Sequence, residues 1–550
     1  MDALLGRDLE EGQVRTIYII SDLHLGGDYP EPRGPGKRGF RLCTRADAIA
    51  QFVDSLNGSC ARHGTSELVL NGDTVDFLAE HDDGLNAWSP FTREPKRAVE
   101  KLEAIVKRDQ IVFDAIRRFL DRRGRVVVLL GNHDIELSLP DVRVAFRHAI
   151  GVKPEHDFEF LYDGEAYVVG DALIEHGNRY DDWNQVDYDA LRHVRSVQSR
   201  RLDASKEHVF VAPAGSEMVT EVINAIKLDY PFVDLLKPET AAVVPMLLAL
   251  EPDFRARLGT IALLYKRTRS HGLADAVTPK FGGDIRSEQS ENRISGGDIG
   301  GNTAADQDGF GGDISADGNS TPHAVRSEQN AALIETLQTS LGGDAEQFLR
   351  SLDAEVAEAD PLGQLGDEIS ASDTVSRISG FAALLFGRSS QPFEKRLPAL
   401  LRAMRGLQHS ETFDPGTESQ TEYLNAAQSL ADRGGFRYVV FGHTHQAKRV
   451  SLGNGRFYFN TGTWADVLQF PNEILKSETD ALAALRTFVE HMKAGDFSAW
   501  TLFRPTYVQL QISDDNKISN AELLTFPEMS TSSASVFPTR IGTLPPALDG

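Results

Sequence analysis

The first third of the sequence alternates short β-branched runs with helical stretches, and each run stops on polar residues. Residues 15–20 end at Ser21-Asp22, residues 67–70 end at Asn71-Gly72, and residues 125–130 end at Gly131-Asn132. Between these runs, apolar residues recur at helical spacing over 46–60 and over about 96–123 as one stripe. Such alternation predicts an α/β fold in which helices cover a β-sheet.

Later parts of the chain follow the same rule. Three further runs end on polar residues: 167–174 before Glu175-His176, 436–441 before Gly442-His443-Thr444-His445, and 457–459 before Asn460-Thr461-Gly462. Residues 506–512 look like a late alternating strand. In open α/β sheets ligands bind beyond the carboxyl ends of the strands, so we expect these polar side chains to share one site.

Composition excludes several classes of protein. The 57 Lys and Arg residues against 81 Asp and Glu residues give a formal charge of −24, which disfavours a broad basic face for nucleic acid. Two cysteines cannot build a disulfide framework. The first 15 residues lack a long apolar stretch, and the longest apolar run, 241–250, is short and contains Pro245. We therefore expect a cytoplasmic protein without a transmembrane segment; its oligomeric state is left open.

The polar strand ends supply carboxylates, imidazoles and an amide. This mixture of nitrogen and oxygen ligands suits Mn²⁺, Fe or Zn²⁺ better than an all-oxygen calcium site. There are too many donors for one tetrahedral ion and about enough for two. Because residues i and i+2 of an extended segment face the same side, the pairs Asp22/His24 and His443/His445 can each point to a common site.

Five blocks in this order resemble the calcineurin-like metallophosphoesterase superfamily. They are Ser21-Asp-Leu-His24, Gly72-Asp-Thr-Val-Asp76, Gly131-Asn-His-Asp134, His176 within Glu-His-Gly-Asn, and Gly442-His-Thr-His445. The resemblance covers roughly 15–180 and 435–465. It implies a β-sheet sandwich flanked by helices and says nothing about the long interval between the last two blocks. Apolar residues at helical spacing within that interval predict a large, mostly helical insertion.

The resemblance also implies roles for nine residues. Asp22, His24 and His445 would bind one metal ion, Asn132, His176 and His443 the other, and Asp73 would bridge the two. Two divalent cations can share a hydroxide that attacks phosphorus in a phosphoester or phosphoanhydride of a small phosphorylated substrate. His133 would face the leaving group and Asp76 would orient it. Mn²⁺ is favoured, with Fe, Zn²⁺ or Ni²⁺ as alternatives.

Details of the five blocks narrow the range of activities expected from the resemblance. Protein serine/threonine phosphatases of this superfamily carry arginine directly after the second block, where this chain has Phe77, so that class is disfavoured. The runs 21–26 and 175–181 are similar to bacterial enzymes of the UDP-diacylglucosamine pyrophosphatase-like group. Arg179 is one candidate for contacting phosphate. The alternatives are a nuclease or cyclic-nucleotide phosphodiesterase of the same superfamily, and an inactive scaffold.

Each block alone has an ordinary structural interpretation, since a histidine after a strand or an aspartate in a turn is common. Their joint order argues for a metal site. The predicted division is 1–181 and 431–529 as the two parts of the catalytic core, 182–430 as an inserted helical cap, and 530–550 as a flexible tail. Within the cap, residues 282–318 are rich in Gly and Asp, poor in bulky residues, and predicted to be a disordered tether.

Overall fold

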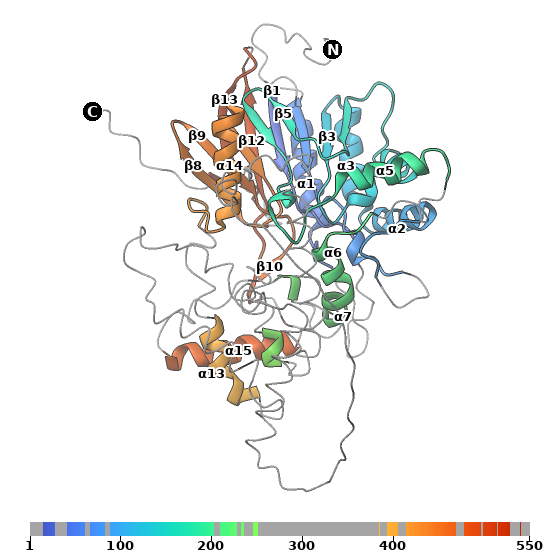
Figure 1. The fold of residues 1–550 in the computed structure, drawn as a ribbon. Helices are drawn as coiled ribbons and strands as arrows, with labels where there is room; N and C mark the ends of the chain where they lie inside the picture. Colours follow the sequence, from blue (N-terminus) through green and yellow to red (C-terminus); the bar gives the residue numbers. More distant parts are fainter. Residues whose placement is uncertain are drawn as a thin grey trace, which may run out of the picture.

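Two β-sheets pack face to face, and helices cover the outer face of each (Figure 1). The computed structural model describes residues 15–27, 41–60, 66–82, 88–202, 210–227, 233–235, 246–250, 384, 393–404, 414–468, 478–494, 496, 499–513, 515–527 and 539–540. Residues such as Ile17, Val127 and Val440 alternate with outward-facing neighbours along their strands and fill the layer between the sheets. This arrangement confirms the predicted α/β sandwich.

The larger sheet has seven strands. In spatial order they are β14 (Thr539–Arg540), β13 (Ile518–Thr525), β12 (Thr506–Ile512), β1 (Arg15–Ile20), β2 (Ser66–Asn71), β3 (Arg125–Leu129) and β4 (Phe158–Leu161). Strands β1 to β4 are parallel, while β12 pairs antiparallel with β1 and β13. The predicted late strand is therefore confirmed, and the carboxyl ends of the four parallel strands lie along one edge.

The second sheet has five strands. In spatial order they are β5 (Tyr167–Val169), β6 (Ala172–Ile174), β7 (Tyr438–Phe441), β9 (Arg456–Thr461) and β8 (Ala447–Gly453). The prediction of one run over 167–174 was wrong, because Tyr167 pairs back onto Ile174 in a tight hairpin. Gly170, at φ +58°, makes that reversal, a conformation that glycine adopts without steric cost.

Helices α1 (Ala46–Cys60), α2 (Pro95–Arg108), α3 (Gln110–Asp121) and α4 (Pro140–Ala149) cover the outer face of the larger sheet. The predicted single stripe over 96–123 is in fact α2 and α3. The chain breaks at Asp109, which is fully buried, has non-helical dihedrals (φ −110°, ψ 26°) and pairs with Arg41. The apolar periodicity continues across the break because both helices face the same core.

Helix α14 (Thr421–Gly434) covers the outer face of the second sheet and packs Tyr423 and Ala427 against Phe441 and Tyr458. Further elements are the short 3₁₀ turns η1 (Phe77–Ala79), η2 (Ile135–Ser138), η3 (Asn178–Tyr180) and η5 (Val233–Leu235), the pair β10 (Val467–Leu468) and β11 (Thr501–Leu502), and α15 (Glu478–Ala494). No helix within the described ranges is both long and apolar enough to cross a lipid bilayer.

The predicted insertion 182–430 contains α5 (Tyr188–Gln198), α6 (Ala214–Met218), a π-helical turn η4 (Val219–Ile223), α7 (Asn224–Lys227) and α13 (Phe393–Met404). Helix α13 lies with α15, away from the sheets (Figure 1). Helices α5 and α14 instead pack against the outer faces of the two sheets, so both outer boundaries of the proposed cap adjoin the sandwich. The division itself stays a prediction, and the tract 282–318 lies outside the described residues.

Candidate metal centre

The carboxyl ends of strands from both sheets meet at one edge of the sandwich, and the loops there carry all nine predicted site residues. These are Asp22 and His24 after β1, Asp73 and Asp76 after β2, Asn132 and His133 after β3, His176 after β6, and His443 and His445 after β7. Backbone hydrogen bonds join neighbouring loops: Asp22 N donates to Gly72 O (3.2 Å), and Gly442 N donates to His176 O (2.9 Å).

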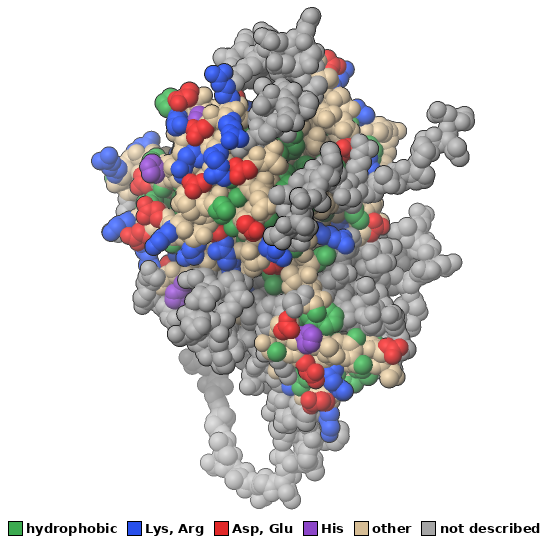
Figure 2. Space-filling view, turned by 180° about the vertical axis from the view of Figure 1, so that it is seen from behind, with side chains coloured by type: hydrophobic (Ala, Val, Ile, Leu, Met, Phe, Trp, Pro, Cys, Tyr) green, Lys and Arg blue, Asp and Glu red, His purple; other side chains and the backbone are tan. Residues whose placement is uncertain are grey.

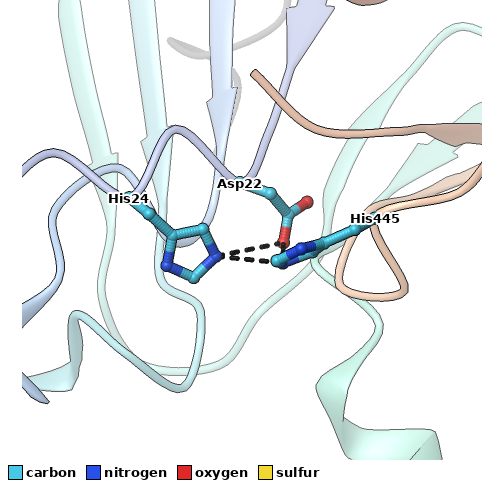
Figure 3. A group of neighbouring side chains, drawn as sticks. All are labelled: Asp22, His24 and His445. Carbon is cyan, nitrogen blue, oxygen red and sulfur yellow. Dashed lines mark hydrogen bonds and ion pairs between the residues drawn. The ribbon is translucent and has the colours of Figure 1, made fainter. Parts of the chain in front are cut away.

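The first cluster contains Asp22, His24 and His445 (Figure 3). The Nε2 atoms of the two histidines lie 3.0 Å apart, and Asp22 Oδ1 lies 3.3 Å from His445 Nε2 and 3.9 Å from His24 Nε2. The other carboxylate oxygen of Asp22 accepts hydrogen bonds from Ser21 Oγ and from the backbone N–H of His443. These bonds turn Oδ1 toward the two imidazoles.

The second cluster contains Asp73, His176 and His443. His176 Nδ1 lies 2.8 Å from the carbonyl oxygen of Asn71, so this nitrogen donates a proton, and in the neutral ring the lone pair lies on Nε2. That Nε2 lies 3.1 Å from Asp73 Oδ2, which is itself 3.8 Å from His24 Nε2. A single oxygen of Asp73 therefore lies between the two clusters, where the predicted bridging ligand should be.

Asp76 lies between two imidazoles. Its Oδ1 is 3.1 Å from His133 Nδ1, and its Oδ2 is 3.3 Å from His24 Nδ1. Burial alone would raise the pKa of Asp76, but His133 and His24 hold that pKa far below its usual range. The His133 side chain is 19% exposed, against 1% for His24. His133 therefore sits at the open side of the cluster, held by a carboxylate.

Five of the nine residues have the left-handed backbone conformation, which residues other than glycine seldom adopt. Their φ angles are 53° at Asp22, 45° at His24, 49° at Asp73, 68° at His443 and 60° at His445. Each costs on the order of 1–2 kcal/mol and persists only where the surrounding structure imposes it. Here the loop hydrogen bonds do so: His24 N, for example, donates to Asp73 O at 2.9 Å. Such strain, concentrated at one site, is typical of functional loops.

The donor set fits divalent cations. Asp22 Oδ1 and Asn132 Oδ1 are buried and accept no hydrogen bond from the part of the chain that the structure describes. A buried oxygen without a donor is costly unless a cation binds it. Although burial opposes it, the carboxylates of Asp73 and Asp22 raise the pKa of His176 to about 10. The same histidine, with His133, holds the pKa of the buried Asp73 well below its usual value. The site thus favours positive charge strongly.

Two glycines allow the loops to approach this closely. A Cβ atom on Gly72, which has φ +83°, would lie 2.5 Å from the His176 ring. A Cβ atom on Gly442 would lie 2.3 Å from Ser21 Oγ and 2.7 Å from Asp22 Oδ2. Any larger residue at either position would displace a predicted ligand.

Sequence reasoning missed several residues that hold these loops. Asp134 accepts hydrogen bonds from Gly131 N (2.7 Å) and Thr74 N (2.8 Å), and so joins the loops after β2 and β3. Asn460 Nδ2 donates to the carbonyl oxygen of Gly442 at 2.6 Å. Both occupy strand ends noted in the sequence, but only the fold shows which loops they join.

Two further residues, Asp181 and Asn184, were also missed. Asp181 Oδ2 lies 3.0 Å from His443 Nε2, and Asn184 Oδ1 lies 3.3 Å from Asn132 Nδ2. Burial opposes ionisation of Asp181, but its contact with His443 holds the pKa of that carboxyl below its usual value. The sequence signal for Asp181 was its place at the end of the run 175–181, five residues after His176.

Arg179 and Phe77, which the sequence singled out, lie elsewhere. The Arg179 guanidinium pairs with Glu175 Oε2 (3.0 Å) and donates to the carbonyl oxygen of Gly164. To contact a phosphate, Arg179 would have to leave this ion pair. Phe77 is fully buried in the core beneath the larger sheet's helices, so the position after Asp76 serves packing.

Comparison with known protein families gave a match to part of the chain. Residues 15–218 match the family described as calcineurin-like phosphoesterase. The match includes seven of the predicted site residues and ends before His443 and His445, which the fold brings to the same edge. Neither the curated proteins nor the solved structures include a significant match to the chain.

Proposed function

Because residues 15–218 match the calcineurin-like phosphoesterase family, we propose that the chain is a hydrolase of small phosphorylated substrates that uses two divalent cations. The observation that carries the proposal is the convergence of two ligand clusters on Asp73, with His133 at their open side. When bound, the cations would activate a water molecule and offset the negative charge that develops on a phosphoryl group.

The proposed ligands of the first cation are Asp22, His24 and His445. Those of the second are Asn132, His176 and His443, and Asp73 is shared between the two. The orientations of these side chains support the assignment, since hydrogen bonds to Asp22 Oδ2 and His176 Nδ1 leave Asp22 Oδ1 and His176 Nε2 directed toward the clusters. Mn²⁺ is the proposed cation because the donors mix imidazole nitrogen with carboxylate and amide oxygen.

His133 is the proposed catalytic residue. Its Nδ1 faces Asp76, which leaves Nε2 to donate a hydrogen bond or a proton to the leaving oxygen of the substrate. Asp76 is the proposed positioning residue that fixes the ring and its tautomer, as a carboxylate beside an imidazole does in other enzymes. The contact of Asp76 with His24 also ties the position of His133 to that of the first cluster.

The inserted segment is proposed to set the choice of substrate. Its helical part at 214–227 touches two loops of the site: Gly215 N donates to Trp183 O (2.8 Å), and Asn224 Nδ2 donates to Leu78 O (2.8 Å), two residues after Asp76. A π-helical turn, Val219–Ile223, lies between these contacts. Such turns often occur at functional sites.

A nuclease is the less favoured alternative. On the face shown in Figure 2, Lys and Arg side chains lie interspersed with Asp and Glu. The formal charge of the chain is −24. A path for a nucleic-acid backbone requires a positively charged groove. These observations favour a small substrate.

The proposal is tested with protein stripped by chelator and reloaded with Mn²⁺, Zn²⁺, Fe²⁺ or Ni²⁺. We expect metal-dependent hydrolysis of p-nitrophenyl phosphate, bis(p-nitrophenyl) phosphate or a nucleotide sugar. Preference for the diester would favour nuclease or cyclic-nucleotide chemistry, and release of a nucleoside monophosphate would favour a pyrophosphatase. Absence of both bound metal and turnover would leave an inactive scaffold and contradict the proposal.

A further inference from the structure

Asp181 and Asn184 connect two proposed ligands of the second cation. Asp181 Oδ2 lies 3.0 Å from His443 Nε2 and 2.6 Å from Asn184 Nδ2. The other end of the Asn184 amide, Oδ1, lies 3.3 Å from Asn132 Nδ2. A continuous chain of hydrogen bonds therefore runs from His443 through Asp181 and Asn184 to Asn132.

The direction of each bond in this chain is determined by the carboxylate. An ionised Asp181 can only accept, so His443 must donate from Nε2 and keep its lone pair on Nδ1. Asn184 must likewise turn its NH₂ group toward Asp181 and its carbonyl oxygen toward Asn132. Asn132 then donates from Nδ2.

The groups left at the two ends of this chain of hydrogen bonds both belong to proposed ligands of the second cation. At one end is the lone pair of His443 Nδ1, and at the other is Asn132 Oδ1. Asn132 is 2% exposed, and its Oδ1 accepts no hydrogen bond within the described part of the chain. The Asp181 carboxylate thus determines the orientation of His443 and, through Asn184, that of Asn132. Asn132 lies 49 positions before Asp181 in the sequence.

Asp181 and Asn184 are themselves held firmly by the loop after η3. Trp183 N donates to Asp181 Oδ1 at 2.9 Å, and Asn178 Nδ2 donates to the carbonyl oxygen of Asn184 at 2.8 Å. Helix α6 begins directly against the amide, since a Cβ atom on Gly215 would lie 2.2 Å from Asn184 Oδ1. The pair is therefore positioned before any ligand binds.

We propose that Asp181 and Asn184 are positioning residues for the second cation: Asp181 selects the tautomer of His443, and Asn184 orients Asn132. This inference rests on the proposed function, because it assumes that the two ligand clusters bind cations. Carboxylate–histidine contacts of this kind raise metal affinity, and their loss typically weakens binding about 10- to 100-fold.

The test compares Asp181→Asn with Asp182→Asn in the full chain, using Mn²⁺ as the only ligand. An amide at 181 offers one acceptor oxygen where three donors now converge, so at least one of the three contacts is lost. Asp182 is the matched control, because its carboxylate contacts Gln185 in the same loop. Calorimetric titration should show a second Mn²⁺ bound about 10- to 100-fold more weakly in Asp181→Asn, and an unchanged first Mn²⁺.

Two further measurements separate positioning from general stability. Electron paramagnetic resonance should show the coupled Mn²⁺ pair in the wild type and in Asp182→Asn, and isolated Mn²⁺ in Asp181→Asn at the same loading. Metal-free variants should melt within a few degrees of the wild type. Asn184→Ala should give the same selective loss, and the double variant little more, because both act through one chain of bonds.

If Asp181→Asn and Asn184→Ala both bind two Mn²⁺ ions as tightly as the wild type does, the inference is overturned and the proposed function stays intact. Equal loss of both ions in Asp181→Asn, or the same loss in Asp182→Asn, would also overturn it. A wild-type chain that binds fewer than two Mn²⁺ ions would instead contradict the proposed function.

Discussion

The Nε2 atoms of His24 and His445 lie 3.0 Å apart although 421 positions separate the two residues in the sequence. Asp22 Oδ1 lies 3.3 Å from one of these nitrogens and 3.9 Å from the other. Lone pairs brought this close repel one another unless a proton or a metal ion lies between them. The fold therefore brings residues that follow the first strand and residues that follow a strand of the second sheet together in one candidate cation site.

Replacement of His133 should separate catalysis from metal binding. In His133→Ala both clusters keep their ligands, so we expect two bound cations and a turnover lowered about 10²- to 10⁴-fold. In Asp73→Asn the shared oxygen loses its charge, so cation content and turnover should both fall. Metal analysis alongside steady-state kinetics checks this pair. Normal metal content in Asp73→Asn, with loss of metal in His133→Ala, would reverse the assigned roles.

Gly72→Ala should weaken cation binding, in addition to the conformational cost of placing alanine in the left-handed region. Both Gly72 (φ +83°) and Gly455 (φ +71°) would hold alanine in the left-handed region, at about 1–2 kcal/mol each. Only at Gly72 would the methyl group strike the His176 ring; Gly455 has open space around it. Cation affinity measured by calorimetry should fall in Gly72→Ala and stay at the wild-type value in Gly455→Ala. Equal affinities in the two variants would show that the contact with His176 is unimportant.

Glu136 should make stability depend on pH. It is completely buried, and this burial raises its pKa from 4.5 to about 7, although a hydrogen bond from Thr92 N opposes the shift. Between these two values the folded chain binds more protons than the unfolded chain, so the free energy of unfolding falls as pH rises. Over that range the loss amounts to about 3 kcal/mol.

The variant Glu136→Gln removes this titration and keeps an acceptor oxygen for Thr92 N. The free energy of unfolding of this variant, relative to that of the wild type, should therefore be about 3 kcal/mol higher at pH 8 than at pH 4. Urea unfolding of both proteins at the two pH values measures the difference. A stability difference that stays the same at pH 4 and pH 8 would contradict the assignment of a raised pKa.

Removal of residues 282–318 should leave the metal centre unchanged. Their Gly- and Asp-rich composition predicts a tether, and none of the described site residues belongs to this tract. We expect the shortened chain to bind two cations and to hydrolyse a generic phosphoester at nearly the wild-type rate. A collapse of metal content in this variant would show that the tract takes part in the fold.

The sequence predicts those residues of the candidate site that follow directly after strands. Asp22, Asp73 and His443 were found because parallel strands deliver their carboxyl-terminal residues to one edge. Asp181 and Asn184 could not be found this way: their importance depends on which atoms of His443 and Asn132 they meet, and that is determined by packing between loops. Motif order indicated the chemistry, and only the fold showed what orients it.

The fold was predicted in outline for a similar reason. Hydrophobic periodicity located α1 and the strands, because burial against one core produces it. The break at Asp109 and the hairpin at Gly170 were missed because neither interrupts that periodicity. At the break, Asp109 pairs with Arg41, which lies 68 positions away in the sequence, and a local pattern cannot show such a contact.

The number of divalent cations bound per chain, measured together with phosphoester hydrolysis in protein stripped by chelator and reloaded with Mn²⁺, tests most directly whether the chain is a two-cation hydrolase. We expect two Mn²⁺ ions per wild-type chain, no hydrolysis without them, and recovery of hydrolysis as the second ion binds. A chain that binds no cation, or that hydrolyses phosphoesters equally well after complete removal of metal, would contradict this expectation.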